Sequence, residues 1–175
     1  PANWDERGHF MQERAIVLSG FMGCGKTTVG KALAEALSRP FCDLDDEIAR
    51  RAGMPIPRIF DALGEDTFRQ LEREALGSLP SLEGFVVASG GGAFTFPDNW
   101  EAAKEHALVV FLDADFPTCY HRVKDSDRPI VRRSTPLQLE ELFRSRYPLY
   151  QAHCHRTVDA SPLPPQVVSS IRALL

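Results

Sequence analysis

The chain contains 175 residues with a formal net charge of −4, and 43% of its residues are hydrophobic while 25% are charged. These values are typical of a globular protein of one domain, and the acidic balance argues against a protein built to bind nucleic acid or an acidic membrane surface. Because the chain has no apolar run long enough to span a bilayer, no secretory signal and no C-x-x-C pair, we expect a cytoplasmic protein without membrane or nucleic-acid partners.

A glycine-rich loop near the beginning of the chain follows a predicted strand. We expect the polar, aperiodic residues 1–12 to be an extension, either disordered or foreign to the natural protein, and residues 13–175 to be a single domain. The apolar run at residues 15–19 predicts a buried parallel strand, and a helical pattern begins near residue 26. Strand, loop and helix therefore arrive in the order that a phosphate-binding loop requires.

Residues 20–28 read Gly-Phe-Met-Gly-Cys-Gly-Lys-Thr-Thr and fit the P-loop pattern G-x-x-x-x-G-K-[ST]. In such a loop, backbone N–H groups and the positive end of the following helix surround phosphate oxygens, while the lysine binds the outer phosphates. The hydroxyl residue after the lysine can ligate Mg²⁺. The residues predicted to contact a nucleoside triphosphate are Gly23, Cys24, Gly25, Lys26, Thr27 and Thr28.

Polar or glycine residues also follow the next two predicted strands. The strand at residues 40–43 ends in a carboxylate cluster that includes Asp43 and Asp45. The strand at residues 85–89 runs directly into three glycines, 90–92, which indicate either a close backbone approach to a ligand or another segment, or a merely flexible loop. Ligands of open α/β sheets bind at this end of the strands, so both segments are candidates for the site.

Helical patterns separate the strands. The predicted helices span residues 45–51, 65–76, 98–105, 115–123, 135–147 and a final stretch from about residue 165. We expect Pro55 and Pro57 to break the chain, a turn near Gly64, and an end to the fifth helix near Pro148. The expected N-caps are Asp98, Asp115 and Thr135.

Two further strands, at residues 107–112 and 156–159, complete the pattern. Alternating strands and helices predict a parallel sheet covered on both faces, which is the three-layer α/β/α P-loop NTPase fold with five parallel strands. Residues 124–134 are basic and have little apolar content. In a phosphoryl-transfer enzyme this segment is expected to be a lid that carries arginines, and otherwise a solvated charged loop.

A P-loop alone does not separate a kinase from a switch GTPase, an ATPase motor or a regulatory module. The chain lacks an N-K-x-D guanine motif and is too short for a motor apparatus, which leaves a small kinase. Such an enzyme needs a second acid for Mg²⁺, a base for the acceptor hydroxyl and cations for the migrating phosphoryl group. Asp43 and Asp45 can supply the first two functions, and Arg128 can supply the last.

Several further motifs occur in a specific order after the P-loop. They are Asp43-Leu44-Asp45, Gly64-Glu65-Asp66-Thr67-Phe68-Arg69, Ser89-Gly90-Gly91-Gly92, Arg128-Pro129, Arg146-Tyr147-Pro148-Leu149-Tyr150 and Val158-Asp159-Ala160. In this combination the chain resembles shikimate kinases from the P-loop nearly to its C-terminal residues. The resemblance implies Mg²⁺-dependent transfer of the ATP γ-phosphoryl group to the 3-hydroxyl of shikimate, in aromatic amino-acid biosynthesis, by a monomer.

The resemblance also implies a role for each matching residue. Asp43 and Thr27 would hold Mg²⁺, and Asp45 would bind a ring hydroxyl and act as the base or orienting group. The other acceptor-binding residues would be Arg69, Gly90, Gly91, Gly92 and Arg146, in part within a helical region at about 44–78. Lys26 and Arg128 would contact the transferring phosphate. Arg122 and the loop at Ser161 and Pro162 would hold adenine.

Alternatives remain open at this point. The chain also fits another small-metabolite or nucleotide kinase, such as gluconate kinase or a nucleoside monophosphate kinase, or a nucleotide-binding regulatory module without catalysis. Without the family pattern, Arg69 is as well explained by a helix-surface ion pair with Glu65 or Glu72, and Arg146 by a cation near a helix C-terminus.

Overall fold

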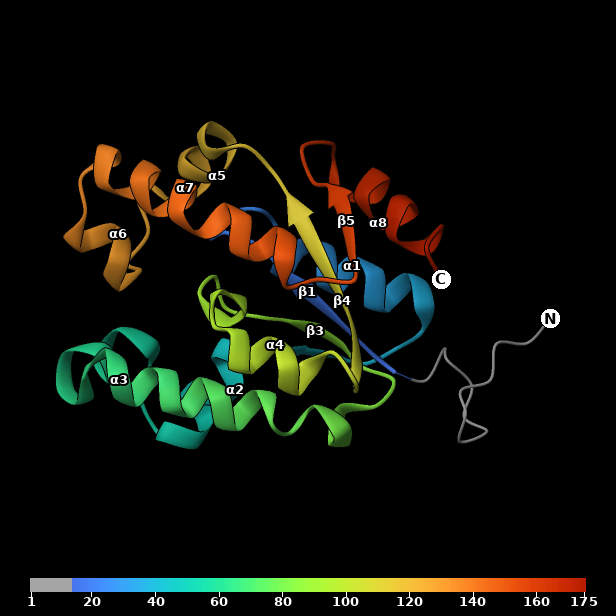
Figure 1. Ribbon diagram of the computed structural model, residues 1–175, viewed down its shortest axis with the longest axis horizontal. Helices are drawn as coiled ribbons and strands as arrows, with labels where there is room; N and C mark the ends of the chain where they lie inside the picture. Colours follow the sequence, from blue (N-terminus) through green and yellow to red (C-terminus); the bar gives the residue numbers. More distant parts are fainter. Residues whose placement is uncertain (1–13) are drawn as a thin grey trace.

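The computed structural model describes residues 14–175, so the extension predicted at residues 1–12 lies outside the described part of the chain. Five strands form one parallel sheet in the order β2-β3-β1-β4-β5 (Figure 1). The strands are β1 Ala15–Ser19, β2 Phe41–Asp43, β3 Val86–Ala88, β4 Ala107–Asp113 and β5 Arg156–Asp159. The five predicted strands are therefore confirmed.

Helices cover both faces of the sheet (Figure 1). They are α1 Lys26–Leu37, α2 Leu44–Ala52, α3 Ile56–Leu76, α4 Pro97–Ala103, α5 Phe116–Val123, α6 Pro129–Arg133, α7 Pro136–Ala152 and α8 Pro164–Arg172, with short 3-10 turns at Leu79–Leu82 and Ala93–Thr95. None of the helices described here is long and apolar enough to cross a membrane.

Two hydrophobic cores lie on either side of β1. Ile16 and Leu18 pack with residues of α1, α5, α7 and α8, whereas Ala15 and Val17 pack with residues of α2, α3 and α4. Successive side chains of a strand point to opposite faces, so an uninterrupted apolar strand can supply both cores. The predicted three-layer architecture is confirmed.

Two of the three expected N-caps are confirmed. The Asp115 carboxylate accepts a hydrogen bond from the Thr118 backbone N–H at 2.9 Å. Thr135 and Gln138 form a complete capping box, with distances of 3.2 and 2.8 Å. The prediction for Asp98 is wrong, because α4 begins one residue earlier at Pro97, with Phe96 at the N-cap, and ends at Ala103. Proline is favoured in the first turn of a helix because the backbone N–H groups there have no carbonyl partner within the helix, so the missing N–H of proline costs nothing.

The expected break is present at Pro55, which is extended between α2 and α3, but not at Pro57, which is helical. Pro55 is the N-cap of α3 and Pro57 lies in its first turn, so these prolines begin a helix. The turn predicted near Gly64 is present as a kink inside α3, where φ is 84° and ψ is 167°. The helix expected from residue 65 is therefore the second half of a longer, kinked helix.

The predicted end of α7 near Pro148 is wrong, since the helix continues through this proline to Ala152. Proline removes one hydrogen bond and crowds the preceding turn, which disfavours an isolated helix. Here the residues on either side are held by packing: Tyr150 is buried in one core, and the Tyr147 ring packs edge-on against Phe111 and at a tilt against Phe143. Burial of these aromatic side chains offsets the local cost.

The carboxyl ends of the central strands converge on one edge of the sheet. The P-loop follows β1, Asp43 ends β2, and residues 89–92 follow β3. The basic segment 124–134 is partly helical, because Pro129 and Val131 of α6 are buried. This convergence brings the candidate site residues together.

Candidate active site

The side chain of Lys26 is held by backbone carbonyl oxygens of the P-loop. The Lys26 Nζ atom donates hydrogen bonds to the carbonyl oxygens of Gly20 at 2.6 Å and Phe21 at 3.1 Å. Gly25 forms the N-cap of α1 with φ of 105°, a conformation that favours glycine. The loop is thus closed around the first turn of α1, whose N–H groups and positive dipole end suit phosphate oxygens.

Thr27 and Asp43 lie together beside this loop. The Thr27 hydroxyl donates to Asp43 Oδ2 at 3.0 Å, while Asp43 Oδ1 accepts from the backbone N–H groups of Asp45 and Asp46 at the start of α2. One carboxylate oxygen is therefore fixed by the helix cap and the other faces the hydroxyl. Oxygen ligands of this kind fit Mg²⁺, which usually takes one or two protein ligands together with phosphate oxygens and water.

A cavity of about 460 Å³ opens next to the loop. Its walls bring together the residues predicted to bind the acceptor, and they come from α2, α3, the loop after β3, the 124–134 segment and α7. These residues are Asp45, Arg69, Gly90, Gly91, Gly92, Arg128 and Arg146. Residues up to 101 positions apart thus border one space, as the order of the motifs suggested.

Asp45 projects into this cavity from the first turn of α2. Its Oδ1 atom is shielded from solvent and has no hydrogen-bond partner among the described residues. Burial and the nearby charge of Asp43 raise the pKa of its carboxyl group, while Lys26, Arg128 and Arg69 act in the opposite direction. An unpaired carboxylate with a raised pKa is suited to accept a proton from a ligand hydroxyl.

Arg69 forms the ion pairs considered for it and also lies at the cavity. Its Nη1 atom bonds to Glu72 Oε1 at 3.0 Å and its Nη2 atom approaches Glu65 Oε1 at 3.5 Å, so the ion pairs on the helix exist. The guanidinium also borders the cavity. Glu72 is 1% exposed and borders the same cavity, and burial raises the pKa of its carboxyl group although Arg69 lowers it.

Glu72 is a residue of the site that the sequence motifs do not single out. The available signal was its position three residues after Arg69 on one helix, which makes the two side chains neighbours. The same spacing is common on solvated helix surfaces, so only the burial of Glu72 distinguishes the two cases. Ser126, whose buried hydroxyl has no partner among the described residues, borders the cavity as well.

Arg146 lies in the middle of α7 and is only 9% exposed, so the interpretation as a helix C-terminal cation is wrong. One turn further on, the Tyr150 hydroxyl donates to the Gly91 carbonyl oxygen. This bond ties α7 to the glycine segment. It places Arg146 on the same cavity wall as the glycines.

The glycines at 90–92 are required by close approach. A Cβ atom at Gly90 would lie 2.9 Å from Asp45 Oδ1, and one at Gly92 would lie 2.6 Å from both Arg69 Nη atoms. Such distances are too short for any side chain to be added without moving the two charged groups. The interpretation as a close-approach segment is therefore favoured over a merely flexible loop.

A smaller cavity of about 200 Å³ lies on the other side of the P-loop and is bordered by Cys24, Gly25, Thr28, Arg122 and Pro162. Arg122 Nη1 donates to the Gly23 carbonyl oxygen at 2.9 Å. The residues predicted to hold adenine thus lie together, except that the Ser161 hydroxyl turns to Asp159 Oδ1 at 2.7 Å and Ser161 does not border this cavity.

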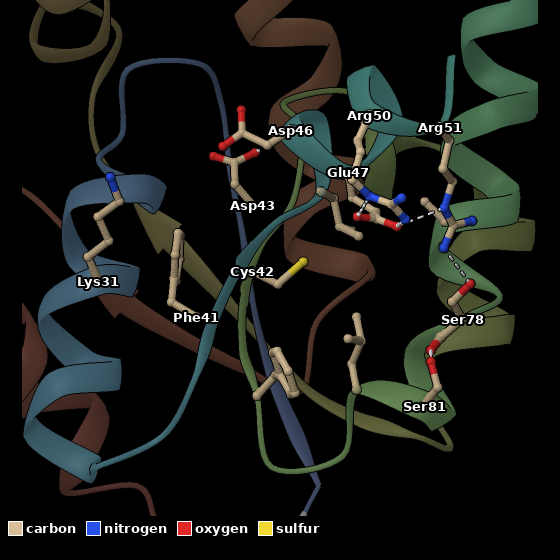
Figure 2. A pocket seen from close by; sticks show the side chains of 14 residues that line it. Lys31, Phe41, Cys42, Asp43, Asp46, Glu47, Arg50, Arg51, Ser78 and Ser81 are labelled. Atoms are coloured by element: carbon tan, nitrogen blue, oxygen red, sulfur yellow. Dashed lines mark hydrogen bonds and ion pairs between the residues drawn. The ribbon is translucent and has the colours of Figure 1, made fainter. Parts of the chain in front are cut away.

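A third cavity, of about 500 Å³, lies outside the edge strand β2 (Figure 2). Glu47 accepts hydrogen bonds from Arg50 and Arg51, at 2.6 to 3.0 Å, and Arg51 Nη2 donates to Ser78 Oγ at 3.0 Å. Of the predicted site residues only Asp43 borders it. The carboxylate of Glu47 in this cavity is already paired with two arginines.

Comparison with known proteins agrees with the site geometry. The family model described as shikimate kinase matches residues 22–175. A shikimate kinase of Dechloromonas aromatica is 44% identical over 152 residues, which cover 86% of this chain and 83% of that protein. The structure of shikimate kinase from Acinetobacter baumannii in complex with shikimate matches with a TM-score of 0.87 and 38% identity, covering 92% of each chain.

One of the alternatives considered from the sequence also appears among the structural matches. A gluconokinase from Sinorhizobium meliloti matches with a TM-score of 0.58 and 21% identity, which shows a shared fold alone. The family match and the relatives near 40% identity carry more information, since they span most of the chain. The chain therefore belongs to the shikimate kinase family of ATP-dependent kinases.

Proposed function

We propose that this protein transfers the γ-phosphoryl group of ATP to the 3-hydroxyl of shikimate, giving shikimate 3-phosphate for aromatic amino-acid biosynthesis. The observation that carries the proposal is the single cavity beside the P-loop where Asp45 meets two arginines, Arg69 and Arg146. A hydroxylated carboxylic acid is the acceptor that complements these groups.

Recognition of the acceptor rests on the two guanidinium groups. A guanidinium presents planar pairs of N–H donors that match the two oxygens of a carboxylate. Arg146 is 9% exposed and the Arg69 side chain is 12% exposed, so their hydrogen bonds face little competition from water. The backbone of Gly90, Gly91 and Gly92 forms the wall against which the acceptor ring lies.

Asp45 serves as the base or orienting group for the acceptor hydroxyl. The hydroxyl oxygen forms a bond to the γ-phosphorus, the bond from that phosphorus to the β,γ-bridging oxygen breaks, and ADP leaves. The hydroxyl proton passes to the Asp45 carboxylate. Because the pKa of Asp45 is raised, the carboxylate is a better proton acceptor than a solvated aspartate.

Cations stabilise the charge that spreads over the transferring group. Lys26 at the P-loop and Arg128, which borders the cavity, would contact the transferring phosphoryl group, and closure of the 124–134 segment as a lid would exclude water. Thr27 and Asp43 would hold Mg²⁺, which when bound neutralises charge on the β- and γ-phosphates. Arg122 and Pro162 enclose adenine, with Ser161 beside them.

We also propose that the protein acts as a monomer, since the residues of a single chain are enough to form the cavity of the proposed site. The deciding experiment is a coupled assay of ADP release with ATP, Mg²⁺ and one acceptor at a time: shikimate, gluconate or a nucleoside monophosphate. Turnover with shikimate well above the others is expected. Turnover with gluconate but not with shikimate would overturn the proposal.

A further inference from the structure

The Arg69 guanidinium lies over two aromatic rings as well as between two carboxylates. Its Cζ atom is 5.2 Å from the ring centroid of Phe68 and 5.3 Å from that of Phe96. Distances below about 6 Å are typical of cation–π contacts. Phe68 is the preceding residue on α3, whereas Phe96 is 27 positions away and reaches Arg69 only through the fold.

Phe96 is held in place by its own backbone. Its carbonyl oxygen accepts hydrogen bonds from the N–H groups of Asn99 at 3.1 Å and Trp100 at 3.3 Å, since Phe96 is the N-cap of α4. The preceding turn is closed by the Thr95 hydroxyl, which donates to the Gly92 carbonyl oxygen at 2.6 Å. Phe96 as a residue is 36% exposed, so its position is not explained by burial in a core.

The two kinds of contact use different parts of the guanidinium. Rings contact its faces, whereas hydrogen-bond acceptors approach its edge. Two of the five N–H donors of Arg69 are engaged, by Glu72 and Glu65, and Nε–H is shielded from solvent without a partner among the described residues. An aromatic face contact therefore restrains the group and leaves part of its edge free for a carboxylate.

The ion pair with Glu65 favours an orientation of the Arg69 side chain that points away from the cavity. Its side chain is 60% exposed and lies on the outer side of α3, so an unrestrained Arg69 would gain solvent and a carboxylate partner by turning outward. Glu72 and the Gly92 backbone hold the inner side of the guanidinium. Phe96 joins Arg69 to the start of α4.

We propose that Phe96 is a positioning residue for the acceptor, which holds the Arg69 guanidinium over its ring so that the free edge meets the substrate carboxylate. This inference rests on the proposed function and deepens it, because it assigns a determinant of acceptor binding to a residue outside the family motifs. Phe96 does not itself touch the reacting atoms.

The test compares steady-state kinetics of the wild type with Phe96→Leu, which keeps an apolar side chain but has no aromatic face. The KM for shikimate should rise about three- to tenfold, the loss expected for a partly exposed cation–π contact, with kcat and the KM for ATP unchanged. Phe96→Tyr should restore the KM for shikimate to within about twofold, since tyrosine keeps the face. A trifluorinated phenylalanine at 96, similar in shape but with a weakened face, should behave like the leucine variant.

Phe85→Leu is the matched control, because Phe85 lies at the opposite end of β3 and no cation lies over its ring within residues 14–175. An unchanged KM for shikimate in Phe96→Leu, equal increases for both substrates, or wild-type kinetics in the fluorinated variant would each overturn the inference. If the wild type itself fails to phosphorylate shikimate, the proposed function falls, and with it the carboxylate that Phe96 is proposed to serve.

Discussion

The carboxylate of Asp45 suits a role in catalysis but costs stability in the folded protein without ligand. Its Oδ1 atom is shielded from solvent without a hydrogen-bond partner among the described residues, although a substrate hydroxyl would supply one. A buried polar atom without a partner costs free energy in the absence of ligand. Sites of this kind are therefore maintained at the expense of stability.

We predict opposite effects of Asp45→Asn on turnover and stability. Loss of the base should lower kcat about 100- to 10,000-fold. The folded-state pKa of Asp45 is raised above its ordinary value of 3.8, so between these values the folded protein binds more protons than the unfolded chain. The free energy of unfolding should therefore fall as pH rises through this window, and Asp45→Asn should remove that loss.

Urea denaturation of both proteins without ligands, at pH 4 and pH 7, measures this effect. Lys26, Arg69, Arg128, Asp43 and Glu72 face Asp45 in both proteins, so their own titration largely cancels in the difference. The variant should gain stability relative to the wild type as pH rises. Near-normal turnover, or a variant that loses relative stability at pH 7, would contradict the assignment.

A second prediction concerns the contribution of Arg146 to shikimate binding. Arg146→Ala should raise the KM for shikimate by roughly tenfold to a hundredfold, the value of a charge-assisted hydrogen bond, and should change the KM for ATP much less. Arg144→Ala is the control, since Arg144 lies on the same helix but is 75% exposed and paired with Glu140. Equal KM changes in the two variants would show that the carboxylate is held elsewhere.

Among the elements, the kinked helix α3 carries most of the acceptor side. Gly64 divides it with φ of 84° and ψ of 167°, a conformation that is essentially restricted to glycine. Phe60 and Phe68 lie on either side of the kink with ring centroids 4.7 Å apart, and both border the cavity next to the P-loop. The kink thus turns two aromatic residues and Arg69 towards one space.

Gly64→Asn and Gly53→Asn make a matched pair for testing the kink. A Cβ atom added at either position meets no atom within 4 Å, so the expected cost is mainly one of backbone conformation. Gly53 has φ of 70° and ψ of 19°, which asparagine tolerates, and its substitution should cost at most about 1 kcal/mol. Gly64→Asn should destabilise by about 1–3 kcal/mol and raise the KM for shikimate. Equal costs in urea denaturation would contradict this account.

The 124–134 segment is the other element that the site depends on. Arg133 Nη2 forms an ion pair with Asp61 Oδ1 at 3.0 Å, which joins this segment to the first half of α3. Both side chains are more than half exposed, so the pair contributes little to stability. The segment is therefore held mainly by the buried Pro129 and Val131 of α6, and only weakly by this ion pair.

For the whole molecule, the parallel sheet determines where the site is formed. The loops after β1, β2 and β3 meet at one sheet edge, and α7 closes the cavity from the C-terminal half of the chain. Ligands that bind this edge therefore contact several elements of the folded state at once. Binding of either substrate should stabilise the entire fold.

We predict that the two substrates stabilise the protein differently when metal is removed. Shikimate at a hundredfold excess over its Kd should raise the free energy of unfolding by about 2.7 kcal/mol, and ATP with Mg²⁺ should act similarly. EDTA should remove much of the ATP effect, because Thr27 and Asp43 are proposed to bind the nucleotide through Mg²⁺, but should leave the shikimate effect intact. Thermal denaturation measures both, and an ATP effect that is insensitive to EDTA would speak against this metal site.

The sequence alone determined the features that depend on local pattern. Apolar periodicity and fixed glycine spacing predict the strand, P-loop and helix of residues 15–37. The caps at Asp115 and Thr135 depend only on contacts with the residue three positions further along the chain. The motifs that carry the family resemblance also predicted which residues would share the cavity next to the P-loop. Each of these signals is a short-range one.

Only the tertiary structure decided the features that depend on long-range packing. The continuation of α7 through Pro148 requires buried partners for Tyr150, and the burial of Glu72 requires the glycine segment after β3. The contact between Phe96 and Arg69 joins two elements whose sequences carry no mutual signal. Local propensity is a weak preference of a few tenths of a kcal/mol to about 1 kcal/mol per residue, whereas burial of a large side chain contributes about 1.5–3 kcal/mol, so packing prevails where the two disagree.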